Sequence, residues 1–211
     1  IPVRKVSVAA AEEKAVLSAV KSAADLGFIE PLLMGKKEKI EAIATEVGLS
    51  RYEMIDCAGE EESVKEAVKA VREGRADVIM KGLVNTSVYM RGILNKEYGL
   101  RTGKLLSLLA VYQLPQYHKL IYCTDSGINV SPNLAQKKDI MENALTAMHN
   151  LGIDNPKTAI LTANEMPDPK VVSTMDAVAL VDMVKNEALP QCIAEGPIAF
   201  DVAFDKHAAD H

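Results

Sequence analysis

The sequence predicts an α/β fold in which the strands of a parallel sheet are joined by crossover helices. Short runs rich in Val and Ile recur along the chain, and a longer stretch with apolar residues at helical spacing follows most of them. Of the 211 residues, 48% are hydrophobic and 25% are charged, which is ordinary for a globular protein. A chain of this length can bury a core that is stable without disulfides or a structural metal.

The first 81 residues carry the alternation most clearly. A glycine, Gly27, Gly48 or Gly74, follows each helical stretch, where a left-handed residue commonly ends a helix. The run at residues 76–80 is nearly continuously apolar, which is typical of a strand covered on both faces. We expect strands at residues 3–10, 29–34, 52–57 and 76–80, and helices at residues 12–26, 36–47 and 60–72.

The pattern changes after Lys81. Two apolar runs, residues 105–114 and 119–123, are separated only by residues 115–118. So short a connection cannot contain a crossover helix, and we therefore expect an antiparallel hairpin. Because the last expected helix has no strand after it, we expect the native sequence to continue beyond His211. Further strands are expected at residues 157–163 and 191–194, and helices at residues 85–94, 133–151, 169–189 and from 198 onward.

Charge and cysteine content argue against several classes of protein. A net charge of −5 and a pI of about 5.5 do not suit a protein built around a nucleic-acid backbone. No apolar run reaches the roughly 18 residues of a membrane span. Cys57, Cys123 and Cys192 form no CxxC pair and belong to no His/Cys cluster at zinc spacing. We therefore expect a cytoplasmic protein without a metal site.

Two common phosphate-binding motifs are absent. No GxGxxG follows the first expected strand, which runs directly into Glu12, and this argues against a Rossmann dinucleotide site. Residues 99–104 imitate a P-loop but have three residues between the glycines instead of four. Leu105 then stands where a Mg²⁺-binding Ser or Thr belongs.

The end of the run at residues 76–80 is the first candidate site. Lys81 follows this strand, and Asn85, Thr86 and Ser87 stand where the next helix begins. Open α/β sheets bind ligands at the carboxyl ends of their strands, and the free N–H groups of a helix start attract anions. The alternative is an ordinary capped helix beside an exposed lysine.

A group of cations in a glycine-punctuated segment is the second candidate. Arg91, Arg101 and Lys104 belong to it, with Thr102 and Ser107 alongside. Arginine offers paired N–H donors that match a phosphate, and glycine lets the backbone approach it. The alternative is a solvated loop whose charges pair with an acidic neighbour.

The polar loop at residues 124–133, directly after an expected strand, is the third candidate. It contains Asp125, Ser126, Asn129 and Pro132. A high density of polar side chains after a buried strand favours a site, but Asp, Ser, Gly and Asn are also the standard residues of turns. A plain turn is therefore the alternative.

Three further residues are weaker candidates. Glu165 and Glu195 each follow an expected strand and could face the same ligand, although each also suits a simple turn. Cys123 lies in an apolar strand without a basic neighbour in sequence. We expect it to be an inert thiol rather than a nucleophile.

Taken together, these segments resemble the phosphate acetyl/butyryltransferase family. The resemblance covers essentially the whole chain, and the segment LRTGKLLS is its most specific part. It is carried by residues 76–86, by Arg91 with residues 94–97, by residues 99–107 and by residues 124–132; Glu142-Asn143-Ala144 and Glu195-Gly196-Pro197 with Asp201 fit as well.

The resemblance implies a three-layer α/β/α fold like that of isocitrate and isopropylmalate dehydrogenases, with two lobes and a cleft. Residues 1–84 would begin the first lobe, residues 85–150 would form the second with the hairpin, and residues 151–211 would return to the first. Family members continue past the Glu-Gly-Pro segment with further strands and a Ser-Arg pair that complete the cleft. The resemblance therefore implies that part of the active site lies beyond His211.

The implied reaction converts butyryl-CoA, or another short or branched acyl-CoA, and phosphate reversibly to acyl phosphate and CoA. The substrates are small molecules, and the resemblance implies no cofactor, no metal, and no nucleic-acid or membrane partner. It also implies a homodimer or a larger homo-oligomer.

The residue chemistry fits this reaction. A thioester and an acyl phosphate interconvert through a tetrahedral centre, so the site needs cations for phosphate, donors for the oxyanion and a base for the CoA thiol. We assign phosphate binding to Lys81, Thr86, Arg91, Arg101, Thr102 and Lys104, oxyanion stabilisation to Ser107, Asn129 and again Thr86, proton transfer to Asp125, and contacts with CoA to Ser126, Pro132, Glu165 and Glu195. Because no Ser or Cys has an evident activating base, we expect direct transfer in a ternary complex rather than an acyl-enzyme.

Two other functions stay open at the level of sequence. A metal-dependent dehydrogenase of the same fold would also hold a phosphate after a strand, but it needs clustered metal ligands that the sequence does not display. A non-catalytic or truncated CoA- or phosphate-binding protein would bind without turnover.

Overall fold

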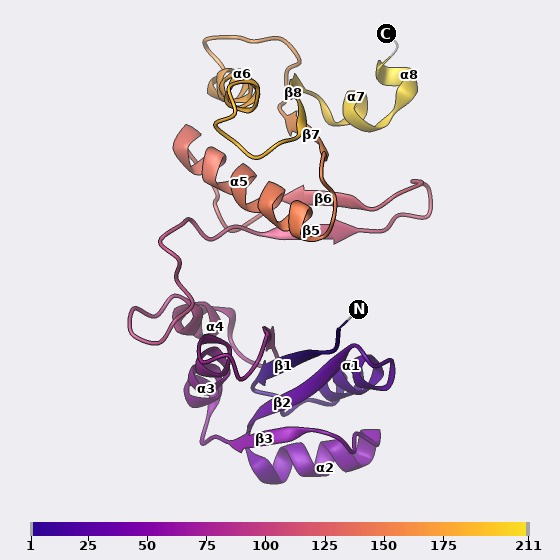
Figure 1. Cartoon of the computed structure of the whole chain (residues 1–211), viewed down its shortest axis with the longest axis vertical. Helices are drawn as coiled ribbons and strands as arrows, with labels where there is room; N and C mark the ends of the chain where they lie inside the picture. The colour runs from indigo at the N-terminus through magenta and orange to yellow at the C-terminus, as the bar shows by residue number, and fades with distance from the viewer. Residues whose placement is uncertain (1, 210–211) are drawn as a thin grey trace. The chain divides into compact units, whose positions relative to one another are not determined.

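The computed structural model describes residues 2–209, which divide into two compact units (Figure 1). Unit 1 is Ile1–Gly103 and unit 2 is Lys104–His211. Unit 1 contains β1 (Arg4–Ala9), α1 (Lys14–Asp25), β2 (Ile29–Gly35), α2 (Lys37–Val47), β3 (Glu53–Asp56), α3 (Glu60–Arg72), β4 (Val78–Lys81) and α4 (Thr86–Ile93). Unit 2 contains β5 (Leu109–Tyr112), β6 (Ile121–Thr124), α5 (Leu134–Asn150), β7 (Lys157–Leu161), α6 (Val172–Lys185), β8 (Ile193–Ile198), α7 (Phe200–Phe204) and α8 (Lys206–Ala209).

The strands of unit 1 form one parallel sheet in the order β3-β2-β1-β4. Successive side chains of a strand point to opposite faces of the sheet. Val8 and Leu33 therefore pack on the face that α1 and α2 cover, while Ala9 and Met34 pack on the face that α3 covers. This unit thus has the predicted three layers, and the predicted α/β class with a parallel sheet is confirmed.

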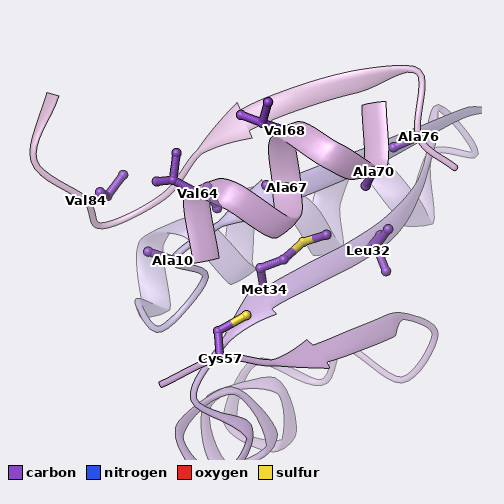
Figure 2. Packing of buried hydrophobic residues seen from close by; sticks show 11 residues of the cluster. Ala10, Leu32, Met34, Cys57, Val64, Ala67, Val68, Ala70, Ala76 and Val84 are labelled. Carbon is purple, nitrogen blue, oxygen red and sulfur yellow. The ribbon is translucent and has the colours of Figure 1, made fainter. Parts of the chain in front are cut away.

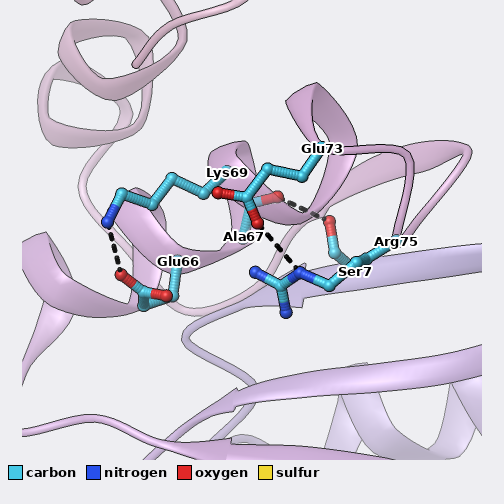
Figure 3. A network of polar contacts seen from close by, with 6 residues as sticks. All are labelled: Ser7, Glu66, Ala67, Lys69, Glu73 and Arg75. Atoms are coloured by element: carbon cyan, nitrogen blue, oxygen red, sulfur yellow. Dashed lines mark hydrogen bonds and ion pairs between the residues drawn. The ribbon is translucent and has the colours of Figure 1, made fainter. Parts of the chain in front are cut away.

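Apolar contacts hold α3 against the sheet. Figure 2 shows Val64 and Ala67 of α3 with Met34 of β2 in one buried cluster. The hydroxyl of Ser7 on β1 is fully buried in this layer and donates a hydrogen bond to the carbonyl oxygen of Ala67 at 3.0 Å (Figure 3). The helix and strand therefore meet without leaving this hydroxyl unpaired.

The carboxyl ends of β1 and β4 approach each other closely. The Gly82 N–H donates to the carbonyl oxygen of Ala9 at 2.8 Å, and the Leu83 N–H donates to that of Ala10 at 2.9 Å. A Cβ atom at Gly82 would lie 2.2 Å from the Ala10 oxygen, so the position requires glycine. The strand order reverses between these two strands, and open α/β sheets bind ligands at such a place.

The predicted hairpin is present in unit 2. Strands β5 and β6 are antiparallel, with Ala110 opposite Cys123. A capping box, in which Asn133 and Gln136 exchange side-chain and backbone hydrogen bonds, starts α5. Met141 and Leu145 of α5 pack with Leu180 of α6 in the core of this unit.

The segment Glu195-Gly196-Pro197 lies inside β8, so the alternative that it forms a simple turn is wrong. β8 pairs with β7 in parallel, and the register between them shifts between Ala159 and Leu161. This irregularity makes room for Pro197, which has no N–H to donate to a regular ladder. Gly196 is needed as well, because a Cβ there would lie 2.8 Å from the side chain of Ile160.

Two features of unit 1 also differ from expectation. Val78 of β4 is 46% exposed, and β4 is an edge strand of this unit, although Ile79 and Met80 pack against the apolar clusters on its two faces. Val88 and Ile93 of α4 pack against the α3 cluster, so residues 85–94, which were expected in the second lobe, belong to unit 1. The return of residues 151–211 to the first lobe, the cleft and the likeness to isocitrate dehydrogenase stay predictions.

Among residues 2–209, no helix is both long and apolar enough to cross a membrane.

Candidate functional site

The first candidate site follows β4 in unit 1. Asn85 caps α4, and its Oδ1 accepts hydrogen bonds from the N–H of Ser87 at 3.0 Å and from its hydroxyl at 2.9 Å. Lys81 and Thr86 are exposed, and their side chains form no hydrogen bond or ion pair with any residue in the described range. The capped helix is therefore present, and within residues 2–209 no side chain or backbone group pairs with the side chains of the lysine and threonine beside it.

A carboxylate already lies at the start of α4. Oε2 of Glu60, the first residue of α3, accepts from the N–H of Asn85 at 3.3 Å. The positive end of a helix attracts negative charge, and here Glu60 supplies it. A phosphate that binds at this helix start would share the position with Glu60.

Arg91 points toward α3 instead of standing alone. Its Nη1 lies 3.5 Å from Oε1 of Glu61, and the two side chains are 69% and 81% exposed. Pairs this exposed contribute little to stability. Arg91 also lines, with Asn95 and Tyr98, a small cavity of about 160 Å³ between α3 and α4.

The backbone before Arg101 and Thr102 is held more firmly than their side chains. Nη1 of Arg72 donates to the carbonyl oxygen of Gly99 at 3.1 Å, which fixes the start of the loop. Arg101 and Thr102 are exposed, and no side-chain partner for either exists within residues 2–209. The two side chains thus follow an anchored turn but are not themselves fixed.

Unit 2 brings together four candidate residues that lie far apart in the sequence. The irregular segment of residues 104–108, just before β5, contains Lys104 and Ser107. The loop after β6 contains Asp125 and Asn129. Hydrogen bonds join the segment to this loop on one side and to helix α5 on the other. We call residues 104–108 the clamped segment.

Helix α5 holds the clamped segment through two neighbouring side chains. Nζ of Lys104 donates to Oε1 of Glu142 at 2.6 Å. Nδ2 of Asn143 donates to the carbonyl oxygen of Leu105 at 2.8 Å and to the hydroxyl of Ser107 at 3.0 Å. The hydrogen bond and the charge of Glu142 raise the pKa of Lys104, and Lys104 in turn lowers the pKa of Glu142.

The last residue of β6 and the loop after it hold the same segment. Nδ2 of Asn129 donates to the carbonyl oxygen of Leu106 at 3.0 Å, and Oγ1 of Thr124 donates to that of Leu108 at 2.7 Å. Nδ2 of Asn129 also donates to Oδ2 of Asp125. Both amide protons of Asn129 are therefore engaged by the protein, and its role as an oxyanion donor stays a prediction.

Asp125 organises its own loop. Its backbone has a φ of 29°, and Oδ1 accepts from the N–H of Ile128 at 2.9 Å and from that of Asn129 at 3.3 Å. Burial raises the pKa of the Asp125 carboxyl, but the hydrogen bonds from Asn129, Ile128 and Gly127 outweigh it, so that the net pKa is lowered. Asp125 is therefore ionised at neutral pH.

The two α5 side chains that hold the segment were not assigned a role from the sequence. Glu142 and Asn143 entered only as part of the family resemblance. The signal that could have found Asn143 is its position in the middle of a helix, where asparagine is a poor helix former, between the buried residues Met141 and Ala144. An unfavourable residue beside the apolar stripe indicates a side chain with a specific partner.

The remaining candidates are not joined to this network. Ser126, Glu165 and Glu195 are exposed and Pro132 is half-buried, and within the described chain none of their side chains forms a hydrogen bond or ion pair. Cys123 is half-buried in β6. No three His, Cys, Asp or Glu side chains among residues 2–209 are grouped as metal ligands would be.

Comparison with known proteins identifies the family. The family described as "Phosphate acetyl/butaryl transferase" matches residues 59–211. The chain is 39% identical over 210 residues to phosphate butyryltransferase from Clostridium acetobutylicum, which covers 99% of this chain and 70% of that protein. The chain belongs to the phosphate acetyl/butyryl transferase family.

Another member and a solved structure agree with this assignment. Phosphate acetyltransferase from Thermotoga maritima is 35% identical over 208 residues, covering 98% of this chain and 70% of that protein. The crystal structure of a branched-chain phosphotransacylase from Enterococcus faecalis V583 superimposes with a TM-score of 0.85 at 26% identity, covering 99% of this chain and 73% of that one. The family resemblance is thus confirmed, and membership of this transferase family replaces the metal-dependent dehydrogenase that the sequence left open.

Proposed function

We propose that this family member transfers an acyl group, butyryl or another short or branched chain, reversibly between CoA and phosphate. Family membership supports acyl-CoA and phosphate as the substrates. The names of the relatives support both chain lengths, since one is a butyryltransferase and another an acetyltransferase. The observation that carries the proposal is the clamped segment, in which a lysine and a hydroxyl are held by hydrogen bonds.

The proposed reaction is direct transfer in a ternary complex. A phosphate oxygen attacks the thioester carbonyl carbon, the C–O bond forms, and the C–S bond breaks as the tetrahedral centre collapses. The sulfur leaves with the bonding electrons as a thiolate, whose pKa of about 8.5 makes it a good leaving group. In the reverse direction the CoA thiol must lose its proton, and Asp125 is our proposed acceptor.

Different roles in this reaction are proposed for the candidate residues. In unit 2, Lys104 and Ser107 are proposed to contact the phosphate and the developing oxyanion, because their positions are already fixed. From unit 1 we propose phosphate contacts for Lys81, Thr86, Arg91, Arg101 and Thr102. Ser126, Pro132, Glu165 and Glu195 keep their proposed contacts with CoA.

Phosphate-dependent release of CoA thiol from butyryl-CoA tests the function. A thiol reagent follows the release, and the assay is repeated with acetyl-CoA and without phosphate. We expect release that requires phosphate and is faster with butyryl-CoA. A folded chain that binds the substrates without releasing thiol would instead be a non-catalytic binding protein, and a butyryl group covalently attached to the protein after rapid quenching would contradict direct transfer.

Arg101→Ala tests the assignment of phosphate binding. We expect KM for phosphate to rise far more than KM for butyryl-CoA, because a guanidinium matches the phosphate oxygens. Arg51→Ala is the matched control, since Arg51 is also exposed but precedes β3 at the amino ends of the strands. Equal losses for both substrates would mean that Arg101 is structural.

We also propose that the chain forms a homodimer or a larger homo-oligomer. Light scattering coupled to size-exclusion chromatography measures this directly. A mass equal to one chain of 22.8 kDa across the concentrations used in the assay would contradict the proposal.

A further inference from the structure

We infer that Asn143 is a positioning residue that makes the Ser107 hydroxyl a hydrogen-bond donor to an oxygen of phosphate or acyl phosphate. The inference rests on the proposed function for the class of ligand. The direction of the hydrogen bond follows from the structure alone. It deepens the role of Ser107 and gives Asn143 a role that the sequence did not assign.

The orientation of the Asn143 amide is fixed by its partner. The two ends of an asparagine amide are distinguished by their hydrogen bonds, since only the NH₂ end donates. The side-chain atom 2.8 Å from the carbonyl oxygen of Leu105 must be the nitrogen, because a carbonyl oxygen only accepts. The same nitrogen lies 3.0 Å from the hydroxyl oxygen of Ser107.

This orientation decides which way the Ser107 proton points. The amide nitrogen has two protons and no available lone pair, so one proton goes to Leu105 and the other to Ser107. The Ser107 oxygen must therefore accept, and its own proton must point away from Asn143. Within residues 2–209, no protein acceptor takes this proton. The hydroxyl proton of Ser107 is therefore available to a negatively charged oxygen atom of a ligand.

The rest of the network leaves this donor role to Ser107. Asn129 donates both of its amide protons, one to the carbonyl oxygen of Leu106 and one to the carboxylate of Asp125. Thr124 donates its hydroxyl proton to Leu108. The neutral side chains that hold the clamped segment thus donate their protons to the protein. The hydroxyl of Ser107, within the segment, is the neutral donor that is left for a ligand.

The position of this donor is also preorganised. The carbonyl oxygens of Leu105, Leu106 and Leu108 all accept side-chain hydrogen bonds, so the backbone on both sides of Ser107 is held. Lys104, three residues earlier, is fixed by Glu142 and adds a positive charge to the same segment. A donor that is fixed before the ligand arrives costs no reorganisation when charge develops on the ligand oxygen.

A double-mutant cycle on the full chain tests the inference. The dissociation constant for inorganic phosphate is measured by calorimetry for the wild type, Asn143→Ala, Ser107→Ala and the double variant, and KM for phosphate and kcat are measured alongside. Each single change should weaken phosphate binding about tenfold or more, because a donor to a charged oxygen is lost or no longer directed. The double variant should bind no more weakly than Ser107→Ala, because Asn143 acts through Ser107.

Asn150→Ala is the matched control, since Asn150 is an exposed asparagine at the end of the same helix, and it should leave phosphate binding unchanged. If Asn143→Ala does not fold, Asn143→Asp takes its place. An aspartate of the same shape accepts from Ser107 and draws its proton inward, so that the same loss is expected. Any repulsion by its charge would persist in the Ser107→Ala background, whereas an effect through Ser107 would vanish there.

Two results would overturn the inference: additive losses in the double variant, or a wild type that does not bind phosphate. Failure of the proposed function looks different. A wild type that binds phosphate but never releases thiol from any acyl-CoA contradicts acyl transfer, while the binding cycle still decides whether Asn143 directs Ser107.

Discussion

The two units hold their candidate site residues in different ways. In unit 1, Lys81 and Arg101 follow elements that are packed by buried apolar layers, but their own side chains have no partners in the described chain. In unit 2, Lys104 and Ser107 are themselves held by hydrogen bonds from α5. Unit 1 therefore fixes the backbone that carries the cationic side chains, whereas unit 2 fixes the side-chain nitrogen of Lys104 and the hydroxyl of Ser107.

This difference follows from the forces involved. Apolar burial is non-directional, so it determines where an element lies without setting the rotamers of the charged residues at its end. Hydrogen bonds have direction and therefore set side-chain positions. A donor that is paired within the protein is, however, no longer available to a ligand, as is the case for the amide of Asn129. Unit 1 therefore suits a ligand that selects side-chain positions as it binds, and unit 2 suits a site that is arranged beforehand.

The largest effect should come from removing apolar packing in unit 1. Leu33 is fully buried in the central strand β2, and Leu33→Ala should lower the free energy of unfolding by about 2–5 kcal/mol. Urea denaturation followed by circular dichroism measures the change. Leu26→Ala is the control, because Leu26 is 67% exposed and its loss should change the free energy by less than about 0.5 kcal/mol. Equal losses for the two leucines would contradict a sheet stabilised by burial.

The next largest effect should come from the close approach of β1 and β4. Gly82→Ala places a Cβ 2.2 Å from the Ala10 oxygen, and the backbone must move to relieve the clash. We expect a loss of about 1–3 kcal/mol in the same denaturation experiment, as for other overpacked sites. At Gly59, a Cβ would meet nothing within 4 Å, so that Gly59→Ala serves as the control. If Gly82→Ala were as stable as Gly59→Ala, the switch point would not be as tightly packed as the structure shows.

Most of the fold could be predicted from the sequence because its signals are local. Helix α2 was expected at residues 36–47 and spans Lys37–Val47, ending at Gly48 in the left-handed conformation. The hairpin was predicted from the length of its connection alone. The strand through Pro197 was missed, because proline disfavours strands and the irregularity that admits it, one extra residue in β8, is defined only by the pairing of β8 with β7. No local signal in residues 195–197 reports on that pairing.

The candidate site was predictable as separate segments but not as a network. The contact between Asn129 and Leu106 joins residues 23 apart, and the contact between Asn143 and Ser107 joins residues 36 apart. Their partners depend on the register of the hairpin and on how α5 lies beside it. The composition after a strand indicates that polar residues gather there. It does not say which of their hydrogen-bond donors are already paired with other groups of the protein.

A smaller effect should appear in the pH dependence of unit 2. Because the folded-state pKa of Asp125 is lowered, its hydrogen bonds contribute stability above the unfolded pKa of about 3.9, and this contribution is lost as the pH falls below that value. The difference in free energy of unfolding between the wild type and Asp125→Asn should therefore shrink between about pH 6 and about pH 2. Asp154→Asn, at an exposed position, is the control and should show a much smaller dependence. A difference that grows on acidification would mean that the pKa of Asp125 is raised in the folded chain.

The smallest effect should come from the ion pair at the start of the clamped segment. Nζ of Lys104 and Oε1 of Glu142 lie 2.6 Å apart, but the lysine is more than half exposed, so that Glu142→Gln should destabilise the chain less than any change above. The loss should also shrink between about 0.01 M and about 1 M salt, where the screening length falls from about 30 Å to about 3 Å. Asp182→Asn, which breaks the more exposed pair with Lys185, is the control and should cost even less. A loss that salt does not reduce would mean that Glu142 stabilises the fold through something other than its charge. A small, screened loss together with weaker phosphate binding would instead mean that the pair orients Lys104, so that unit 2 arranges its charges for a ligand rather than for its own stability.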